Sequence, residues 1–385
     1  MTKPPVPATF ILLLVLLCTA CGPDAGPPPL TTTELQTRLD AVQAAMPKVP
    51  GFSLAVLLPD GSMISASTGQ ADPDGRPMTA DTPVRQASIT KPLVAVAILR
   101  LYEEQRLDLD ATIDTLISRE INTLLASDGY DPSKITVRHL LLHASGLNDH
   151  FPLPAYQQRV LANPGYVWTP MTQLQLFAAS TDPLDPPGQS YFYSDPGYIL
   201  LGLILERLTQ GPMGEAVRDL LDLDDIGLEN SWWEGDEPSN DVPGRAHQWL
   251  NGGEYDAFYV HGSVDAFGGG GLIASVEEVA LFFAGLFAGQ VFKEPTTLEL
   301  MTSGPGKPAD SEYLYGLFGK THAGLQVFGH GGFWGTDAVT VPELQLTMAG
   351  VALDQSGIEA LRTLEGELIE LVAERVAPAP GSDTH

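Results

Sequence analysis

The sequence has little cysteine, few basic residues and few long apolar runs, and each shortage excludes a class of protein. Its two cysteines, Cys18 and Cys21, both lie near the N-terminus, so a disulfide framework does not hold the body together. Lys and Arg number 20 against 48 Asp and Glu, a formal net charge of −28. Such a charge repels nucleic-acid phosphates and anionic lipid head groups. We therefore expect no nucleic-acid partner.

The one long apolar run, residues 8–20, follows Lys3 and is shorter than the roughly 20 residues that cross a bilayer. This pattern predicts a signal peptide over residues 1–20. The segment Leu17–Cys21 resembles the lipobox of bacterial lipoproteins, although Cys18 stands where leucine is usual. The resemblance implies lipidation of Cys21 and a periplasmic or surface lipoprotein of the bacterial envelope, with membrane contact through that anchor only. Ordinary secretion is the alternative.

The rest of the chain predicts one discontinuous domain with an insertion. A Pro/Gly-rich tether covers residues 21–30, and a disordered tail covers residues 378–385. Between them we expect an α/β sheet domain built from residues 31–107 and 231–377, and an inserted, mainly helical domain over residues 108–230.

Local patterns support this organisation. Thr31 with Glu34 has the spacing of a capping box and predicts a helix to Met46. The turn Pro59–Gly61 predicts a β-hairpin between strands 52–58 and 63–68. Further predicted elements are a helix at 91–105, strands at 268–274, 313–318, 326–328, 338–341 and 346–351, and helices at 275–287 and 356–376, the last two capped by Ser275 and Ser356. The fold class is thus α+β, with an antiparallel sheet flanked by N- and C-terminal helices.

Ser88 and Lys91 are the first candidate catalytic residues. They are three residues apart at the start of a predicted helix, so they share a face and an amine lies beside a hydroxyl. Serine needs a base to become a good nucleophile, and a desolvated lysine can be that base. A helix cap followed by a surface lysine is the simpler reading of this short motif alone.

Two further motifs follow in order, Tyr193-Ser194-Asp195 and Gly329-His330-Gly331-Gly332-Phe333. Together with Ser88–Lys91 they resemble the serine β-lactamase and penicillin-binding-protein superfamily, in its class C β-lactamase-like branch of D,D-carboxypeptidases, D-aminopeptidases and esterases. Segments 138–147 and 269–275 are also similar to that family. The resemblance runs from about Pro50 to Val372, and it implies the β-lactamase/transpeptidase-like fold.

The resemblance implies a role for each motif. Ser88 would be the acylated nucleophile, and Lys91 and Tyr193 would share the work of base and acid, in an order left open. The N–H of Phe333 would join that of Ser88 in an oxyanion hole. Gly331 and Gly332 would let substrate approach the backbone closely.

Two departures from the family pattern concern the substrate. Asp195 stands where many relatives have Asn, so it lacks an amide donor and can pair with Lys91, which would shift the base role toward Tyr193. His330-Gly331-Gly332 replaces the Lys-Thr-Gly of β-lactamases and removes a permanent cation. We therefore expect peptidase, carboxypeptidase or esterase activity on a small-molecule or peptide substrate rather than efficient β-lactam hydrolysis.

Other functions fit the sequence less well. His139, His143, Asp149 and His150 could suggest zinc, but Leu140 occupies the place of the Glu in the His-Glu-x-x-His pattern. We expect neither a metal nor a cofactor. A non-catalytic envelope lipoprotein that binds peptidoglycan fragments or a partner is the main alternative to a serine hydrolase, yet it would not need Ser88, Lys91 and Tyr193 together.

Overall fold

The computed structural model describes residues 28–239 and 244–376. The predicted signal peptide, Cys21 and the tail 378–385 lie outside these residues. At the end of the predicted tether, Leu30 is 3% exposed and packs in the core, so the folded body begins slightly before Thr31. Within the described residues, none of the helices combines the length and apolar character needed to cross a bilayer.

The N-terminal elements form as the sequence predicts. Helix α1 (Thr32–Ala45) starts at Thr31, whose side chain accepts a hydrogen bond from the Glu34 N–H. Strands β1 (Gly51–Leu57) and β2 (Met63–Gly69) pair antiparallel as the expected hairpin.

The main sheet joins the two ends of the chain. Its six strands lie in the order β2-β1-β11-β10-β9-β8, and every neighbouring pair is antiparallel. The four C-terminal strands are β8 (Phe318–His322), β9 (Leu325–Gly332), β10 (Thr336–Val341) and β11 (Leu346–Ala352). Since β1 pairs with β11, the hairpin docks directly on the C-terminal strands.

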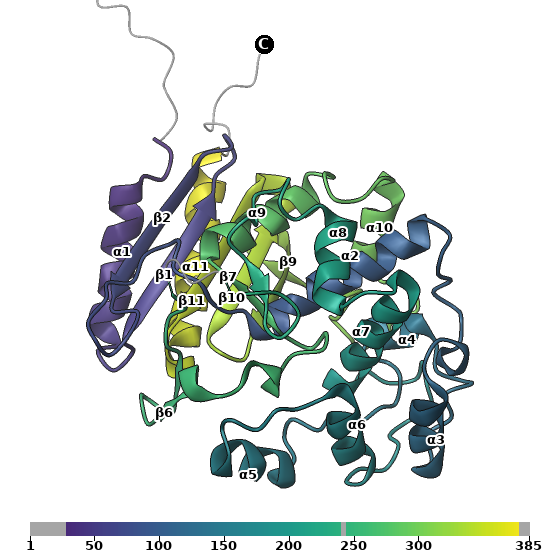
Figure 1. Ribbon diagram of the computed structural model, residues 1–385. Coiled ribbons are helices and arrows are strands. Elements are labelled where there is room, and N and C mark those ends of the chain that lie inside the picture. Colours follow the sequence, from purple (N-terminus) through teal and green to yellow (C-terminus); the bar gives the residue numbers. More distant parts are fainter. Residues whose placement is uncertain (1–27, 240–243, 377–385) are drawn as a thin grey trace, which may run out of the picture.

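Helices cover both faces of this sheet (Figure 1). In β1, Phe52, Leu54 and Val56 point to the face covered by α1 and α11 (Ile358–Val376), while Ala55 joins the larger core on the opposite face. This is the period-two alternation of a strand buried on both sides. Helix α9 (Val276–Phe287) packs on the second face. The predicted α+β class, with terminal helices on an antiparallel sheet, is confirmed.

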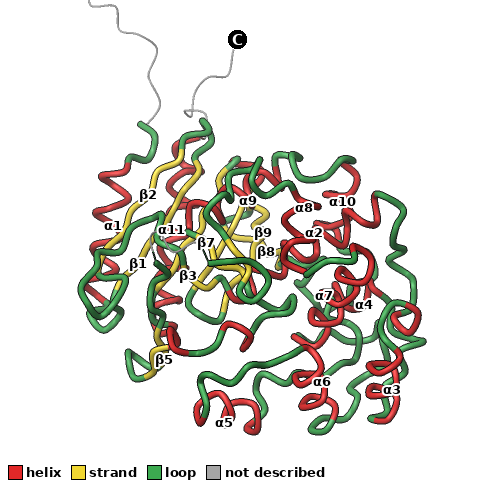
Figure 2. The backbone as a smooth tube through the Cα atoms, in the orientation of Figure 1, coloured by secondary structure: helices red, strands yellow, loops and turns green. Residues whose placement is uncertain are grey.

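The middle of the chain is mainly helical, as Figure 2 shows. Its helices are α3 (Arg119–Ser127), α4 (Val137–Leu141), α5 (Pro154–Ala162), α6 (Pro170–Ala178), α7 (Asp195–Thr209) and α8 (Met213–Leu221). Helix α2 (Thr90–Glu103) precedes them and α10 (Pro295–Ser303) follows. A small sheet combines β3 (Val84–Arg85), β7 (Leu272–Ala274) and β4 (Trp232–Trp233), and β5 (Trp249–Leu250) pairs with β6 (Tyr255–Asp256).

Three local expectations were wrong. Residues 313–318 do not form a strand, because Gly316 has a φ of +80° and turns the chain against α2; β8 begins only at Phe318. The strand expected at 268–274 is reduced to β7, since Gly268 and Gly271 also have positive φ. Asp354 rather than Ser356 caps the turn before α11: its carboxylate accepts the Ser356 N–H. The capping box at Ser275 forms as predicted.

Candidate active site

Ser88 and Lys91 lie where a short 3-10 turn, η1 (Ala87–Ile89), runs into α2. Ser88 is partly exposed and Lys91 is fully buried. Ala87 has a φ of +47°, a left-handed conformation that is costly for a residue with a Cβ and that clusters at functional sites. The first N–H groups of a helical turn have no acceptor within the turn, so the Ser88 N–H is free to serve a ligand.

Lys91 uses all three of its donors. Its Nζ lies 2.9 Å from Ser88 Oγ, 2.8 Å from the Gly269 carbonyl oxygen and 2.7 Å from Asp195 Oδ1. Burial acts to lower the pKa of Lys91, but the charges of Asp195 and Tyr193 and hydrogen bonds with both residues together outweigh burial and raise that pKa. Lys91 is therefore an ammonium ion that donates to the Ser88 hydroxyl, and the expected pairing with Asp195 is present.

Tyr193 completes this group just before α7. The Lys91 Nζ lies 4.9 Å from the centre of its ring. Burial raises the pKa of Tyr193, and the charge of Lys91 and hydrogen bonds with Lys91 and Ser88 partly oppose that rise. The structure thus brings together Ser88, Lys91, Tyr193 and Asp195 from two separate segments.

The end of β9 packs against η1, which brings the motif Gly329–Phe333 next to Ser88. A Cβ on Gly332 would clash with the Gln86 carbonyl oxygen, so only glycine permits this approach. Thr336 fixes the contact by donating from its Oγ1 to the same carbonyl, at 3.0 Å. Phe333 follows, and its ring packs on Phe151 with centroids 4.6 Å apart. The backbone of Gly332 and Phe333 therefore borders Ser88.

His330 is buried in β9 and is not a cation. Its Nδ1–H donates to the Gly331 carbonyl oxygen at 2.7 Å, and its Nε2 lies 3.2 Å from the Tyr313 hydroxyl. Burial, aided by the charge of Lys91, lowers the pKa of His330 to about 3. A neutral imidazole occupies the place of the lysine in the β-lactamase motif, and sequence patterns gave no sign of its partner Tyr313.

A groove of about 590 Å³ opens beside Tyr193 and β9. Its wall includes Gly331, Gly332 and Phe333, and its far side carries Lys320 and Arg362. Arg362 is already paired with Asp337 at 2.9 Å and with Glu359 at 2.8 Å. The groove is the candidate substrate site, because it shares Tyr193 and the β9 backbone with the group around Ser88.

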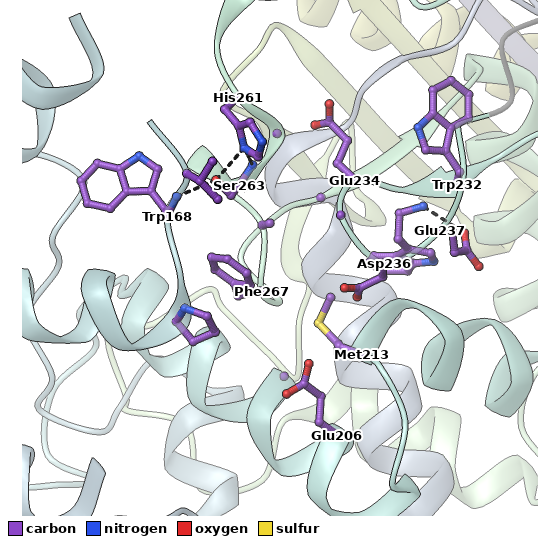
Figure 3. A pocket seen from close by; sticks show the side chains of 18 of the residues that line it. Trp168, Glu206, Met213, Trp232, Glu234, Asp236, Glu237, His261, Ser263 and Phe267 are labelled. Atoms are coloured by element: carbon purple, nitrogen blue, oxygen red, sulfur yellow. Dashed lines mark hydrogen bonds between the residues drawn. The ribbon is translucent and has the colours of Figure 1, made fainter. Parts of the chain in front are cut away.

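A second cavity of about 510 Å³, the acidic cavity, is chemically different (Figure 3). Trp168 and Phe267 lie on one side of it and Glu234 and Asp236 on the other. Among the described residues, those that line it include no Lys or Arg, and none of Ser88, Lys91 and Tyr193. We therefore assign the reaction to the groove and not to this cavity.

Two of the three histidines weighed as zinc ligands accept backbone N–H groups instead. The Nδ1 of His139 accepts the Thr136 N–H at 3.2 Å, and the Nδ1 of His143 accepts the Ser194 N–H at 3.1 Å. Over residues 28–239 and 244–376 the structure holds no group of three or more His, Cys, Asp or Glu side chains that could hold a metal ion. Sequence reasoning named Asp149 only as a possible zinc ligand. In the structure it is a largely buried carboxyl whose pKa burial and the charge of Asp195 raise to about 7.

Comparison with known proteins defines the class to which this fold and site belong. The family model described as Beta-lactamase matches residues 39–370, so the chain belongs to the β-lactamase family. The predicted family is confirmed.

Particular relatives carry different activities. Esterase EstB of Burkholderia gladioli is 32% identical over an alignment of 237 residues. The match covers 57% of this chain and 57% of the esterase, so the chain spans little more than half the length of that relative. Among solved structures, a D-stereospecific amidohydrolase from Streptomyces sp. has a TM-score of 0.75 at 23% identity, covering 87% of this chain and 99% of its own. The D-amino acid amidase of Ochrobactrum anthropi SV3 has a TM-score of 0.76 at 20% identity, covering 90% and 100%. These structures show the shared fold.

Proposed function

We propose that this chain is a serine hydrolase that forms an acyl-enzyme on Ser88 and hydrolyses an uncharged ester or amide. The observation that carries the proposal is the contact of the buried Lys91 ammonium with Ser88 Oγ at 2.9 Å, next to Tyr193 and the end of β9. A binding module does not need a buried cation held against a hydroxyl. The esterase relative supports the same conclusion.

Acylation follows from this arrangement. The substrate carbonyl lies in the groove with its oxygen toward the N–H groups of Ser88 and Phe333, which stabilise the oxyanion. With Tyr193 ionised to the phenolate, Ser88 Oγ bonds to the carbonyl carbon while its proton passes to the phenolate oxygen. Lys91 does not take the proton, because beside Asp195 it is already an ammonium ion. When the bond to the alcohol or amine breaks, Tyr193 returns that proton to the leaving group.

Deacylation repeats these steps with water. The water loses a proton to Tyr193 as its oxygen bonds to the acyl carbon, and the ester bond to Ser88 then breaks with the proton returned to Ser88 Oγ. Lys91 stays an ammonium ion throughout and stabilises the negative charge on the Ser88 and Tyr193 oxygens.

The charges around the groove favour an uncharged acyl group. His330 is neutral, Asp195 is committed to Lys91, and Arg362 is already paired with two carboxylates. These three residues therefore provide no unpaired cation at the place of the Lys-Thr-Gly lysine, and Lys320, which lines the groove from the neighbouring strand β8, is the cation that remains for a substrate carboxylate. Ester and simple amide substrates need none.

Intact-mass spectrometry tests this function directly. The chain from residue 28 onward, which keeps the buried Leu30, is incubated with a fluorophosphonate and, separately, with a penicillin, and Ser88→Ala is the control. We expect a Ser88-dependent phosphonate adduct and no lasting penicillin adduct. A stable penicilloyl adduct would instead indicate a penicillin-binding carboxypeptidase, and consumed penicillin with unmodified protein a β-lactamase. A folded protein that takes neither label would support the binding-module alternative.

We also propose export and lipid attachment at Cys21, on the evidence of the sequence between Leu17 and Cys21 alone. The mass of the mature protein made in a bacterial host tests it. A lipid-sized mass increase that Cys21→Ala abolishes is the expected result, and an unmodified N-terminus near residue 21 would contradict it.

A further inference from the structure

His143 lies at the end of α4 and beneath Tyr193. It is 1% exposed and has a φ of +51°, a conformation that a residue with a Cβ keeps only where its surroundings enforce it. Its ring lies against four tyrosine rings. The centroid distances are 4.2 Å to Tyr193, 4.5 Å to Tyr313, 5.0 Å to Tyr198 and 6.2 Å to Tyr191.

Two hydrogen bonds tie His143 to the residues on both sides of Tyr193. The Phe192 N–H donates to the His143 carbonyl oxygen at 2.8 Å, and the Ser194 N–H donates to His143 Nδ1 at 3.1 Å. The imidazole ring also stacks on the Tyr193 ring at an interplanar angle of 33°. His143 therefore restrains the backbone before and after Tyr193 as well as its side chain.

These bonds exclude an acid–base role for His143. A backbone N–H can only donate, so Nδ1 must keep its lone pair and the ring proton sits on Nε2. Burial, with the charge of Lys91 as a smaller cause, lowers the pKa of His143 well below its ordinary value of 6.5. The imidazole stays neutral, and its one free lone pair is occupied by the Ser194 N–H.

We propose that His143 is a positioning residue for Tyr193, which holds the phenol oxygen at the distance from Ser88 and Lys91 that proton transfer requires. This inference rests on the proposed function, because it assigns Tyr193 a part in the reaction. It gives His143 a role that the resemblance to other family members does not supply. Loss of the restraint lets the phenol shift, and a displacement of about 1 Å can lower a rate by about 100-fold.

Three variants separate the possible contributions of His143. His143→Phe keeps a ring for stacking but removes the acceptor for the Ser194 N–H. His143→Asn restores a side-chain acceptor near Nδ1 without the ring. His139→Asn is the matched control, because His139 lies in α4 just before His143 and its Nδ1 also accepts a backbone N–H, that of Thr136 at 3.2 Å.

The measurement is the second-order rate of fluorophosphonate labelling of Ser88 between pH 6 and 10, on protein shown by circular dichroism to be folded. We expect His143→Phe to lower the rate by about 100-fold and to move the pH midpoint upward, because a displaced phenol loses part of the stabilisation by Lys91. His143→Asn should recover most of the rate, and His139→Asn should retain the wild-type rate and midpoint.

Each outcome decides between the two proposals. Wild-type protein that is never labelled at Ser88 would overturn the proposed function itself. Labelled wild type with unchanged rates and midpoint in His143→Phe would overturn the positioning role alone. Equal losses in His143→Phe and His139→Asn, without a midpoint shift, would reduce His143 to a structural residue and overturn the proposal as well.

Discussion

The molecule contains two buried ion pairs, Arg85 with Glu234 and Lys91 with Asp195, and the two cations differ in their other hydrogen-bond acceptors. Arg85 is 3% exposed and donates to both carboxylate oxygens of Glu234, at 2.8 and 3.0 Å, and to the carbonyl oxygens of Ala257 and Val260. Lys91 is fully buried and donates to Asp195 and the Gly269 carbonyl, but its third acceptor is the hydroxyl of Ser88.

The difference separates a structural pair from a reactive one. The Arg85 guanidinium contacts only a carboxylate and two backbone carbonyl oxygens, and none of them is a nucleophile in the proposed reaction. Its fork geometry holds together the segments that contain Arg85, Glu234 and residues 257–260. The ammonium of Lys91 is a point charge next to a hydroxyl and a phenol, so it influences where a proton can go. Burial and ion pairing alone therefore do not identify a catalytic cation. What distinguishes Lys91 from Arg85 is its contact with the hydroxyl of Ser88.

Replacing Lys91 should show the difference between the two ion pairs most clearly, because it should abolish most of the activity. In Lys91→Met we expect ester hydrolysis to fall by about 10⁴-fold, at the upper end of what a positioned acid–base group contributes. The measurement is kcat/KM with a chromogenic ester, and the melting temperature shows whether the protein is folded. Hydrolysis within about tenfold of wild type would assign the reaction to other residues.

Breaking the Arg85 pair should instead affect folding. Glu234→Gln leaves a buried guanidinium without its counter-charge, and the free energy of unfolding should drop by about 3–5 kcal/mol. Chemical denaturation measures this loss, and kcat at a temperature where the variant is folded should stay close to wild type. A large loss of kcat in folded protein would show that this pair, too, acts on the reaction.

The substitution Asp195→Asn tests how the negative charge paired with Lys91 affects the reaction. Without that carboxylate, burial lowers the pKa of Lys91, and the pKa of Tyr193 falls because Asp195 no longer opposes its ionisation. In wild type the raised pKa of Tyr193 should make kcat/KM rise as pH increases above neutral. The variant should reach its plateau at a lower pH than wild type, and identical pH profiles would contradict the role given to Asp195.

The smallest expected effect concerns Asp149, whose pKa in the folded protein is about 7 against an ordinary 3.8. Between these values the unfolded chain has lost the proton and the folded protein still holds it, so stability falls as pH rises through this window. Asp149→Asn should remove that part of the pH dependence. Melting temperatures from pH 4.5 to 7.5, compared between wild type and variant, measure it.

The sequence predicts much of this fold and part of the site. Capping residues and a turn placed α1, the β1–β2 hairpin and α9, because these depend on neighbours within a few residues. The pairing of Lys91 with Asp195 was expected because the resemblance to the family brings the Tyr193–Asp195 motif to Lys91. The stretch at 313–318 was not, because Gly316 turns to fit against the distant α2. The environment of His143 likewise depends on tyrosines from separate segments, which no local pattern reveals.

The pairing of β1 with β11 also has a consequence for biosynthesis. A ribosome makes residues 51–57 well before residues 346–352, yet each strand supplies the neighbour that the other needs. Until β11 has been made, the β1–β2 hairpin has an open edge that can join other chains. The nascent polypeptide is therefore vulnerable to aggregation during that interval, and chaperones that bind extended apolar strands would act on it then.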